Sequence, residues 1–244
     1  MTNASPTTAS MLRSAVWARG LSAEQMRRVE QETQERVYRA GAVLCHKNAP
    51  ATHWIGVVEG MVKVDNVAAD GRSTTFIGVS EGGWLGEGSL LKGEARPYEV
   101  VALRDCRVAL MPALTFHHLV DTSLTFNRFL IDQLNARLGQ FVALVESYRM
   151  HDVASRVACC LAELFNPQLN PLTNHMLQIS QEEIGRLAGL SRQIAHRALH
   201  ELEDAGLVQV RYGSVDVCDV DGLRRYVHER GAGAPPMTKP MRTR

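Results

Sequence analysis

The sequence carries almost no net charge, has few cysteines and lacks a long hydrophobic run. Its 27 lysines and arginines are balanced by 26 aspartates and glutamates, which gives a formal net charge of +1. A chain so balanced does not attract nucleic acid through its overall charge, so any nucleic-acid site must arise from local clustering. No apolar stretch approaches the roughly 18 residues of a membrane span, so no membrane contact is expected.

Cysteine usage and the absence of catalytic motifs exclude further classes of protein. The 5 cysteines are odd in number and are not spaced as metal ligands, so we expect reduced thiols, no metal site and a cytoplasmic location. The vicinal pair Cys159–Cys160 is interpreted as core filling. No Ser-His-Asp set can be argued, and the glycine-rich stretch "GGWLGEG" lacks the lysine of a phosphate-binding catalytic loop. We therefore expect no catalytic residue and no enzyme.

The first half of the chain is predicted to be rich in β-strands. Residues 1–20 form a polar start that we interpret as a flexible leader, and residues 21–120 contain many short strand patterns separated by glycines. In "EGMVKVDNVAADGRSTTFIGV" two such patterns flank a turn at Asp70–Gly71, which indicates a hairpin. These features predict a compact antiparallel β-barrel or roll.

Residues 121–150 are predicted to form one long helix. Its apolar residues step by three or four positions over about three heptads, which is typical of a coiled-coil seam. The seam consists of Leu130, Leu134, Leu138, Phe141, Val145 and Tyr148. A second copy of the chain is the expected partner, so we predict a homodimer. The alternative is that the helix lies on its own β-roll.

Residues 151–230 carry the signals of a small helical domain with a β-hairpin. Ser180 and Glu183 match a capping box, Gly189 permits a tight turn, and Ser191 begins the next helix. Two short strand patterns then flank a turn at residues 212–214. This order predicts a winged helix-turn-helix, followed by a disordered tail at residues 231–244.

The helix that begins at Ser191 presents an unusual stripe of polar side chains. At about 100° per residue, the spacing places these side chains on one face, and no acid follows until Glu201. The stripe contains Arg192, Gln193, His196, Arg197 and His200. Such a face can simply be solvated, but forked donors at the start of a supported helix also suit a DNA major groove.

Several predicted features extend the DNA-binding set beyond the stripe. Ser180, Ser191 and the helix N-termini are suitable phosphate contacts, which position the domain without specifying sequence. Arg211, beside the turn of the predicted hairpin, is also assigned to this set.

Three segments together resemble the family of the bacterial cyclic-AMP receptor protein and fumarate–nitrate regulator (Crp/Fnr). They are "SQEEIGRLAGLSRQIAHRALHELEDAGLV", "GGWLGEGSLLKGEARPYEVVAL" and "DVASRVACCLAEL", and the likeness covers roughly residues 35–228. The resemblance implies an α+β fold: an N-terminal antiparallel β-roll of the cupin-like jelly-roll kind, a long dimerisation helix and a C-terminal winged helix-turn-helix. By this likeness, Arg192 and Arg197 match base-reading arginines. Gln193 stands where the cyclic-AMP receptor protein has a glutamate, and His196 either contacts DNA or faces solvent.

The resemblance also implies an effector site in the β-roll. Gly86–Glu87 and Arg96 match the family's phosphate and sugar contacts, but Pro97 offers neither a hydroxyl nor an N–H to a phosphate. Hydrophobic residues occupy the positions expected to meet a purine. The predicted effector-binding set is Gly86, Glu87, Gly88, Ser89, Arg96, Phe141 and Val142. A cyclic nucleotide, another small molecule or no effector all remain open, and Glu87 with Arg96 could instead form a salt bridge that closes the roll.

These observations predict a homodimeric transcription regulator that binds an inverted-repeat operator in double-stranded DNA and acts with RNA polymerase. Its activity is expected to respond to a small effector in the β-roll. The alternatives are an effector-independent regulator of the same family, or a cyclic-nucleotide-binding module whose main role is not DNA binding. No cofactor beyond the candidate cyclic nucleotide is indicated.

Overall fold

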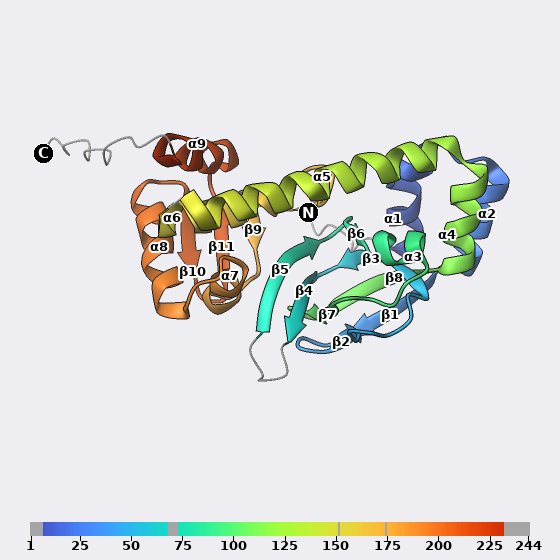
Figure 1. The fold of residues 1–244 in the computed structure, drawn as a ribbon, viewed down its shortest axis with the longest axis horizontal. Helices are drawn as coiled ribbons and strands as arrows, with labels where there is room; N and C mark the ends of the chain where they lie inside the picture. The colour runs from blue at the N-terminus through green and yellow to red at the C-terminus, as the bar shows by residue number, and fades with distance from the viewer. Residues whose placement is uncertain (1–6, 68–72, 151, 174, 232–244) are drawn as a thin grey trace, which may run out of the picture.

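Two four-stranded antiparallel sheets form the β-roll in the first half of the chain (Figure 1). In the computed structural model, which describes residues 7–67, 73–150, 152–173 and 175–231, the sheets have the strand orders β1-β8-β3-β6 and β2-β7-β4-β5. The strands are β1 (Gln34–Tyr38), β2 (Val43–Cys45), β3 (His53–Glu59), β4 (Met61–Val67), β5 (Ser73–Ser80), β6 (Trp84–Leu85), β7 (Glu99–Ala102) and β8 (Cys106–Pro112). Apolar residues of both sheets, such as Val57, Val64 and Val108, belong to one buried cluster. Burial of these alternating side chains therefore holds the two sheets together.

The predicted hairpin is confirmed by the pairing of β4 with β5. Val64 lies opposite Ile77, and both side chains are buried. The predicted turn at Asp70–Gly71 lies outside the described residues.

The prediction of a flexible leader is wrong for residues 8–20. This segment forms α1 (Thr8–Ser14) and the 3₁₀ helix η1 (Val16–Gly20), with Met11, Leu12 and Trp17 buried. The Trp17 ring lies 5.6 Å from the Trp54 ring and 5.4 Å from the Trp84 ring, measured between centroids. Three large apolar side chains are enough to fix this otherwise polar stretch on the roll. Residues 1–6 lie outside the described part.

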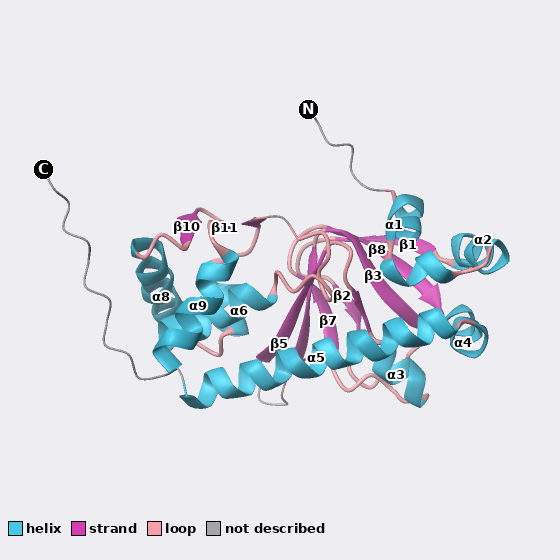
Figure 2. Cartoon of the chain, turned by 90° about the horizontal axis from the view of Figure 1, so that it is seen from above, coloured by secondary structure: helices cyan, strands magenta, loops and turns pink. Residues whose placement is uncertain are grey.

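Short helices surround one end of the roll and lead into a long one. These are α2 (Ala23–Glu32), α3 (Glu87–Lys92) and α4 (Ala113–Thr122), followed by the 27-residue α5 (Leu124–Met150). Figure 2 shows α5 running along one edge of the molecule, from the roll to the C-terminal domain.

Helix α5 has two apolar faces rather than one. The inner face, toward the roll and the C-terminal domain, buries Phe126, Leu130 and Leu144 together with Gln133 and Gln140. A second face leaves large apolar side chains exposed: Ile131, Leu134, Leu138, Phe141, Val142, Val145 and Tyr148. The helix therefore lies on its own roll, as the alternative expected, and its second apolar face is uncovered in a single chain. Leu130, which we predicted in the dimer seam, belongs to the roll-facing side at 3% exposure.

The C-terminal domain has the predicted order of helix, turn, helix and β-hairpin. Its elements are α6 (Val153–Glu163), β9 (Met176–Leu177), α7 (Gln181–Leu187), α8 (Arg192–Asp204), β10 (Val208–Arg211), β11 (Ser214–Val217) and α9 (Val220–Gly231). Helix α9, which packs beside α6, has no counterpart among the predicted elements. Residues 232–244 of the predicted tail lie outside the described part. No helix within the described ranges is long and apolar enough to cross a bilayer.

A buried ion-pair group joins the C-terminal domain to the roll. Lys63 Nζ on β4 lies 2.9 Å from Asp65 Oδ2 and 3.3 Å from Glu183 Oε2 on α7. Lys63 and Asp65 are 4% and 3% exposed, so their charges are shielded from water and need each other as partners.

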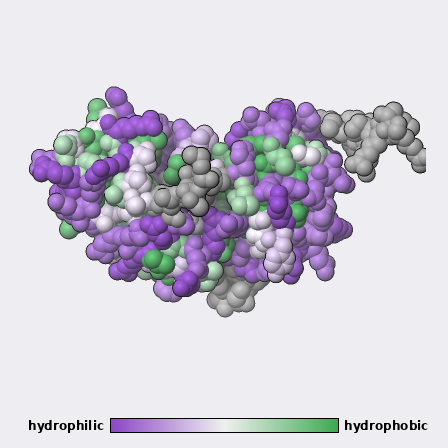
Figure 3. Space-filling view, turned by 180° about the vertical axis from the view of Figure 1, so that it is seen from behind, coloured by the Kyte–Doolittle hydropathy of each residue, from purple (hydrophilic) through white to green (hydrophobic). Residues whose placement is uncertain are grey.

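Figure 3 shows two lobes whose surface is mainly hydrophilic, with apolar residues in small patches on each.

Candidate nucleic-acid interface and effector site

Helix α8 is held against the domain by its apolar side. The Ser191 hydroxyl accepts a hydrogen bond from the Ile194 N–H at 3.4 Å and caps the helix as predicted. Ala195, Leu199 and Leu202 are fully buried. The opposite side of the helix is therefore presented to solvent in a fixed orientation.

The predicted polar stripe lies on that exposed side. Arg192, Gln193, His196 and Arg197 are all exposed, and together with Gln181 of α7 they border one shallow hollow. Among the residues that the structure describes, neither arginine has an ion-pair partner. Their guanidinium donors are thus available to an external acceptor.

Two histidines of the stripe make specific contacts. His196 Nδ1 lies 2.9 Å from Gln181 Oε1, and its ring meets the His200 ring edge to face with centroids 4.3 Å apart. His200 Nδ1 lies 3.0 Å from Glu203 Oε2. Gln181 is absent from the predicted set because it lies on a different helix, 15 residues away.

The first helix of the pair is capped as predicted, but only half of the capping box forms. The Ser180 hydroxyl accepts from the Glu183 N–H at 3.1 Å. The Glu183 carboxylate binds Lys63 of the roll instead of returning to the Ser180 N–H. A tertiary partner therefore replaces the local one.

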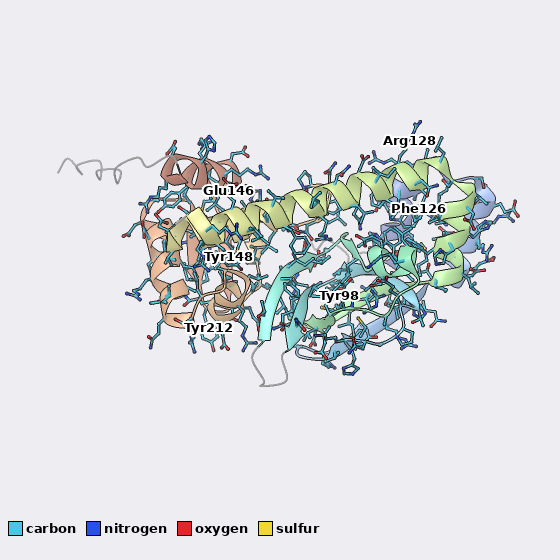
Figure 4. The ribbon with its side chains drawn as sticks, viewed as in Figure 1. Tyr98, Phe126, Arg128, Glu146, Tyr148 and Tyr212 are labelled. Carbon is cyan, nitrogen blue, oxygen red and sulfur yellow. The ribbon has the colours of Figure 1, made fainter. Side chains whose placement is uncertain are left out.

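The turn between α7 and α8 is held by residues outside both helices. The Tyr148 hydroxyl donates to the Leu187 carbonyl oxygen at 3.0 Å, and Arg156 Nη2 donates to the Ala188 carbonyl oxygen at 2.7 Å. Gly189 has φ +62°, as its predicted tight turn requires. Tyr148 lies near the end of α5, beside the C-terminal domain (Figure 4). The apolar spacing of the sequence places this residue only in the dimer seam.

The hairpin β10–β11 is the wing of the domain. Arg211 is exposed, but its Nε lies 2.6 Å from Asp216 Oδ2. Tyr212 at the turn is fully exposed and points away from the domain (Figure 4). Arg211 therefore differs from the two arginines of the stripe, because its charge already has a partner.

The predicted effector residues of the roll lie close together. Gly86 has φ +94°, and a Cβ added there would overlap Arg96 Nη1. Glu87, Ser89 and Arg96 are buried. At Gly88 an added Cβ would meet nothing within 4 Å, so its lack of a side chain has no packing cause.

Arg96 and Glu87 do not form the salt bridge considered as an alternative. Within the described residues Glu87 Oε2 instead accepts from Trp54 Nε1 at 3.3 Å. Arg96 Nη2 donates to the His53 carbonyl oxygen, whereas Nη1 is buried without a partner in the described structure. A buried guanidinium N–H left unpaired is costly, so this atom suits an anionic ligand.

Two further residues near this cluster were missed. Tyr98 lies in the roll (Figure 4), and burial raises the pKa of its hydroxyl, although the Arg96 charge opposes that shift. Arg137 of α5 donates to the Trp84 carbonyl oxygen at 3.3 Å. Burial lowers the pKa of this guanidinium, while the nearby Glu87 carboxylate opposes the change. No motif in the sequence pointed to either side chain.

Phe141 and Val142 lie apart from the buried cluster. They are 39% and 58% exposed on the outer side of α5, whereas the adjacent Gln140 is buried. One chain alone therefore does not cover these two side chains, and their place in an effector site stays a prediction.

All five cysteines are free thiols, and no group of three or more metal-ligating side chains was found among the described residues. Cys159 and Cys160 are buried in α6, and burial raises the pKa of the Cys159 thiol to about 11. A thiol with such a pKa is a poor nucleophile at neutral pH, in agreement with a packing role.

Comparison with known proteins gives two domain matches. Residues 35–123 match the model of a cyclic nucleotide-binding domain, and residues 155–226 match that of a Crp-like helix-turn-helix domain. Together these models span most of the roll and most of the C-terminal domain.

Curated relatives and solved structures agree with these matches. The chain is 30% identical over 162 residues to the cAMP-activated global transcriptional regulator Vfr of Pseudomonas aeruginosa, covering 64% of this chain and 75% of Vfr. It is 25% identical to the transcriptional regulator SdrP of Thermus thermophilus, covering 80% of this chain and 95% of SdrP. The structure of FixK2 from Bradyrhizobium japonicum has the same fold, with a TM-score of 0.67 at 20% identity over 79% of this chain and 96% of that one.

Proposed function

The chain belongs to the Crp/Fnr family of DNA-binding transcription regulators, and we propose that it binds an inverted-repeat DNA operator as a homodimer through helix α8. The observation that carries this proposal is the exposed stripe of α8. Arg192 and Arg197 there have outward donors without ion-pair partners among the described residues, on a helix whose other side is buried. Arginine pairs with the two acceptors of guanine in the major groove.

The exposed apolar face of α5 supports the homodimer. Leu138, Val142 and Val145 are at least half exposed in a single chain. A second α5 packed on this face removes that surface from water, and the two α8 helices then read half-sites about one DNA turn apart, roughly 34 Å.

A set of matched arginine variants tests DNA binding. Arg192→Ala and Arg197→Ala are expected to weaken specific binding by about tenfold or more, in line with the roughly 1–3 kcal/mol of a bidentate arginine–guanine pair. Arg224→Ala removes an exposed arginine of α9 that pairs with Asp221, and its affinity should stay near wild type. Fluorescence anisotropy on an operator selected by the wild-type protein provides the measurement. Equal losses in all three variants would indicate a general charge effect and contradict the proposal.

Gln193 is expected to set one operator position. A glutamate accepts from cytosine, whereas glutamine pairs best with adenine. Gln193→Glu should therefore shift the base preference at that position toward cytosine when half-site panels are compared, and an unchanged preference would refute this assignment.

For the roll, we propose a small anionic effector held at Gly86, Glu87, Ser89 and Arg96, with a cyclic nucleotide as the first candidate. The unpartnered Arg96 Nη1 fits a phosphate, while Pro97 removes one donor that such a ligand would use. Calorimetric titration with cyclic AMP, cyclic GMP and cyclic di-GMP tests this assignment. Saturable binding that is lost in Arg96→Gln would support it. If none of the three nucleotides gives heat of binding, the cyclic-nucleotide assignment fails. Effector-independent control or a different small molecule is then the interpretation.

As a transcription regulator, the protein is proposed to act in the cytoplasm with RNA polymerase and to have no catalytic role. This proposal rests on membership of the family, because the relatives of the chain are transcription regulators. Transcription from a template carrying the selected operator, with and without purified protein, tests the action on polymerase.

A further inference from the structure

His196 and Gln181 form a hydrogen-bonded pair at the centre of the polar stripe. The Nδ1–Oε1 distance is 2.9 Å, and both residues border the same hollow as Arg192, Gln193 and Arg197. The pair joins α7 to α8 on the side that the proposed function assigns to DNA.

The partner of His196 fixes the state of its ring. An amide oxygen only accepts hydrogen bonds, so the proton of the neutral imidazole lies on Nδ1. Nε2 then carries a lone pair and acts as an acceptor.

The His200 ring further restricts the His196 ring. The two rings meet at 89° with centroids 4.3 Å apart, and His200 is itself bound to Glu203. With one nitrogen hydrogen-bonded and one side in contact with His200, the His196 ring is held ready for a partner.

This arrangement adds an acceptor to a surface of donors. Arg192 and Arg197 can only donate, and Gln193 can both donate and accept. In the major groove, adenine and cytosine present amine donors, whereas guanine and thymine present carbonyl acceptors. Resting on the proposed DNA binding, we infer that His196 Nε2 reads an amine-bearing base, adenine or cytosine, and that Gln181 is the positioning residue that sets this preference.

Changing the partner of His196 should change the base that it reads. In Gln181→Glu, a carboxylate accepts from Nδ1–H and favours the imidazolium, in which Nε2 becomes a donor. The preferred base should then change to guanine or thymine, which present only acceptors in the major groove, and cytosine should lose more than adenine, whose N7 also accepts. Gln181→Ala frees the ring and should relax the preference without reversing it.

The experiment is selection of full-length protein variants on randomised inverted repeats, followed by sequencing. Wild type should favour adenine or cytosine by about five- to tenfold at one position of each half-site. His196→Ala should lose that preference, and Gln181→Glu should reverse it. Arg224→Ala, which removes an exposed arginine of α9 outside the stripe, should keep the wild-type preference.

Two outcomes would overturn the inference, and they are distinguishable from failure of the proposed function. If wild type selects a motif that depends on Arg192 but His196→Ala selects the same motif, base reading by His196 is wrong and DNA binding stands. If Gln181→Glu leaves the preference of wild type unchanged, Gln181 does not set it. If wild type selects no motif, the proposed function itself fails and the inference fails with it.

Discussion

Gly189 and Gly213 share a backbone conformation but differ in their surroundings. Their φ angles are +62° and +71°. A Cβ added at Gly189 would lie 2.9 Å from Tyr148 Cε1, whereas one added at Gly213 would meet nothing within 4 Å. Alanine variants at the two positions therefore separate two effects: the strain of the left-handed conformation, which both share, and the overlap with Tyr148, which only Gly189→Ala has.

Gly189→Ala should destabilise the C-terminal domain more than Gly213→Ala. Both variants carry the backbone strain of about 1 kcal/mol, and Gly189→Ala must also displace the ring that braces the helix-turn-helix turn, for a total of about 2–3 kcal/mol. Denaturant unfolding followed by circular dichroism measures both. Equal losses would mean that Tyr148 moves aside freely.

Glu163 provides a prediction of pH dependence. Burial raises the pKa of this carboxyl, although the hydrogen bond to Asn166 opposes the shift, and Oε2 has no partner in the described structure. A carboxyl whose pKa is raised in the folded state contributes stability at low pH, and this contribution is lost as the pH rises above the unfolded value of 4.5.

Glu163→Gln should therefore raise the melting temperature near pH 7 by roughly 2–4 °C, for a gain of about 1 kcal/mol or less. The difference should shrink as the pH falls toward 4.5, where the wild-type carboxyl becomes neutral. Thermal scans across this range measure it, with Glu229→Gln, an exposed site on α9, as the control. A gain that does not depend on pH would contradict the charge argument.

At the scale of elements, helix α5 has two faces with different surroundings. Gln133 and Gln140 are buried on its roll-facing side, and Gln133 Nε2 donates to the Trp84 carbonyl oxygen at 3.3 Å. The outer face is apolar and exposed. A helix with 3.6 residues per turn can present two such stripes because each needs only part of the circumference.

Leu138→Glu should convert the dimer to monomers and weaken operator binding by at least tenfold. Leu138 is 62% exposed in one chain, so a charge there leaves the fold of the monomer intact but would be buried between two α5 helices. Sedimentation velocity gives the oligomeric state. The control is Leu114→Glu on α4, which is 79% exposed and should remain dimeric; a dimeric Leu138→Glu would place the interface elsewhere.

At the scale of the whole molecule, the Lys63–Glu183 contact links the helix-turn-helix to the roll. Glu183 lies on α7, and its neighbour Glu182 makes only local contacts with Arg186 at 2.8 Å. The two glutamates therefore carry the same charge and lie on the same helix, but only Glu183 contacts the roll.

Glu183→Gln should loosen α7 from the roll, whereas Glu182→Gln should not. The amide keeps an acceptor for Lys63 but loses the charge, and a weakening of about 1 kcal/mol predicts roughly fivefold faster amide exchange in α7 and β4. Hydrogen exchange followed by mass spectrometry resolves both segments. The same change in both variants would mean that the ion pair does not hold the domains together.

Structural features that depend on a local sequence pattern could be predicted. The strand around Val62 and Val64, the glycine between two helical patterns and the serine caps at Ser180 and Ser191 all appear as expected. Local propensity and hydrogen bonding determine such features, so a window of about ten residues contains the necessary information.

Contacts between distant residues could not be predicted. Trp17 looked like part of a polar leader because its partners, Trp54 and Trp84, lie far along the chain. The pairing of His196 with Gln181 likewise depends on the angle between two helices. Such contacts are set by tertiary packing, which no local pattern encodes.

The aromatic cluster under η1 has a practical consequence for spectroscopy. The protein's 3 tryptophans all belong to that cluster, on the N-terminal side of the molecule, and the C-terminal domain has none. Intrinsic tryptophan emission therefore monitors mainly the roll and its N-terminal cover. Among the described residues, the C-terminal domain reaches these rings through Gln168, Pro171 and Leu172, which border the same hollow as Trp17 and Trp84. A tryptophan introduced at Tyr212 would give the helix-turn-helix its own optical signal.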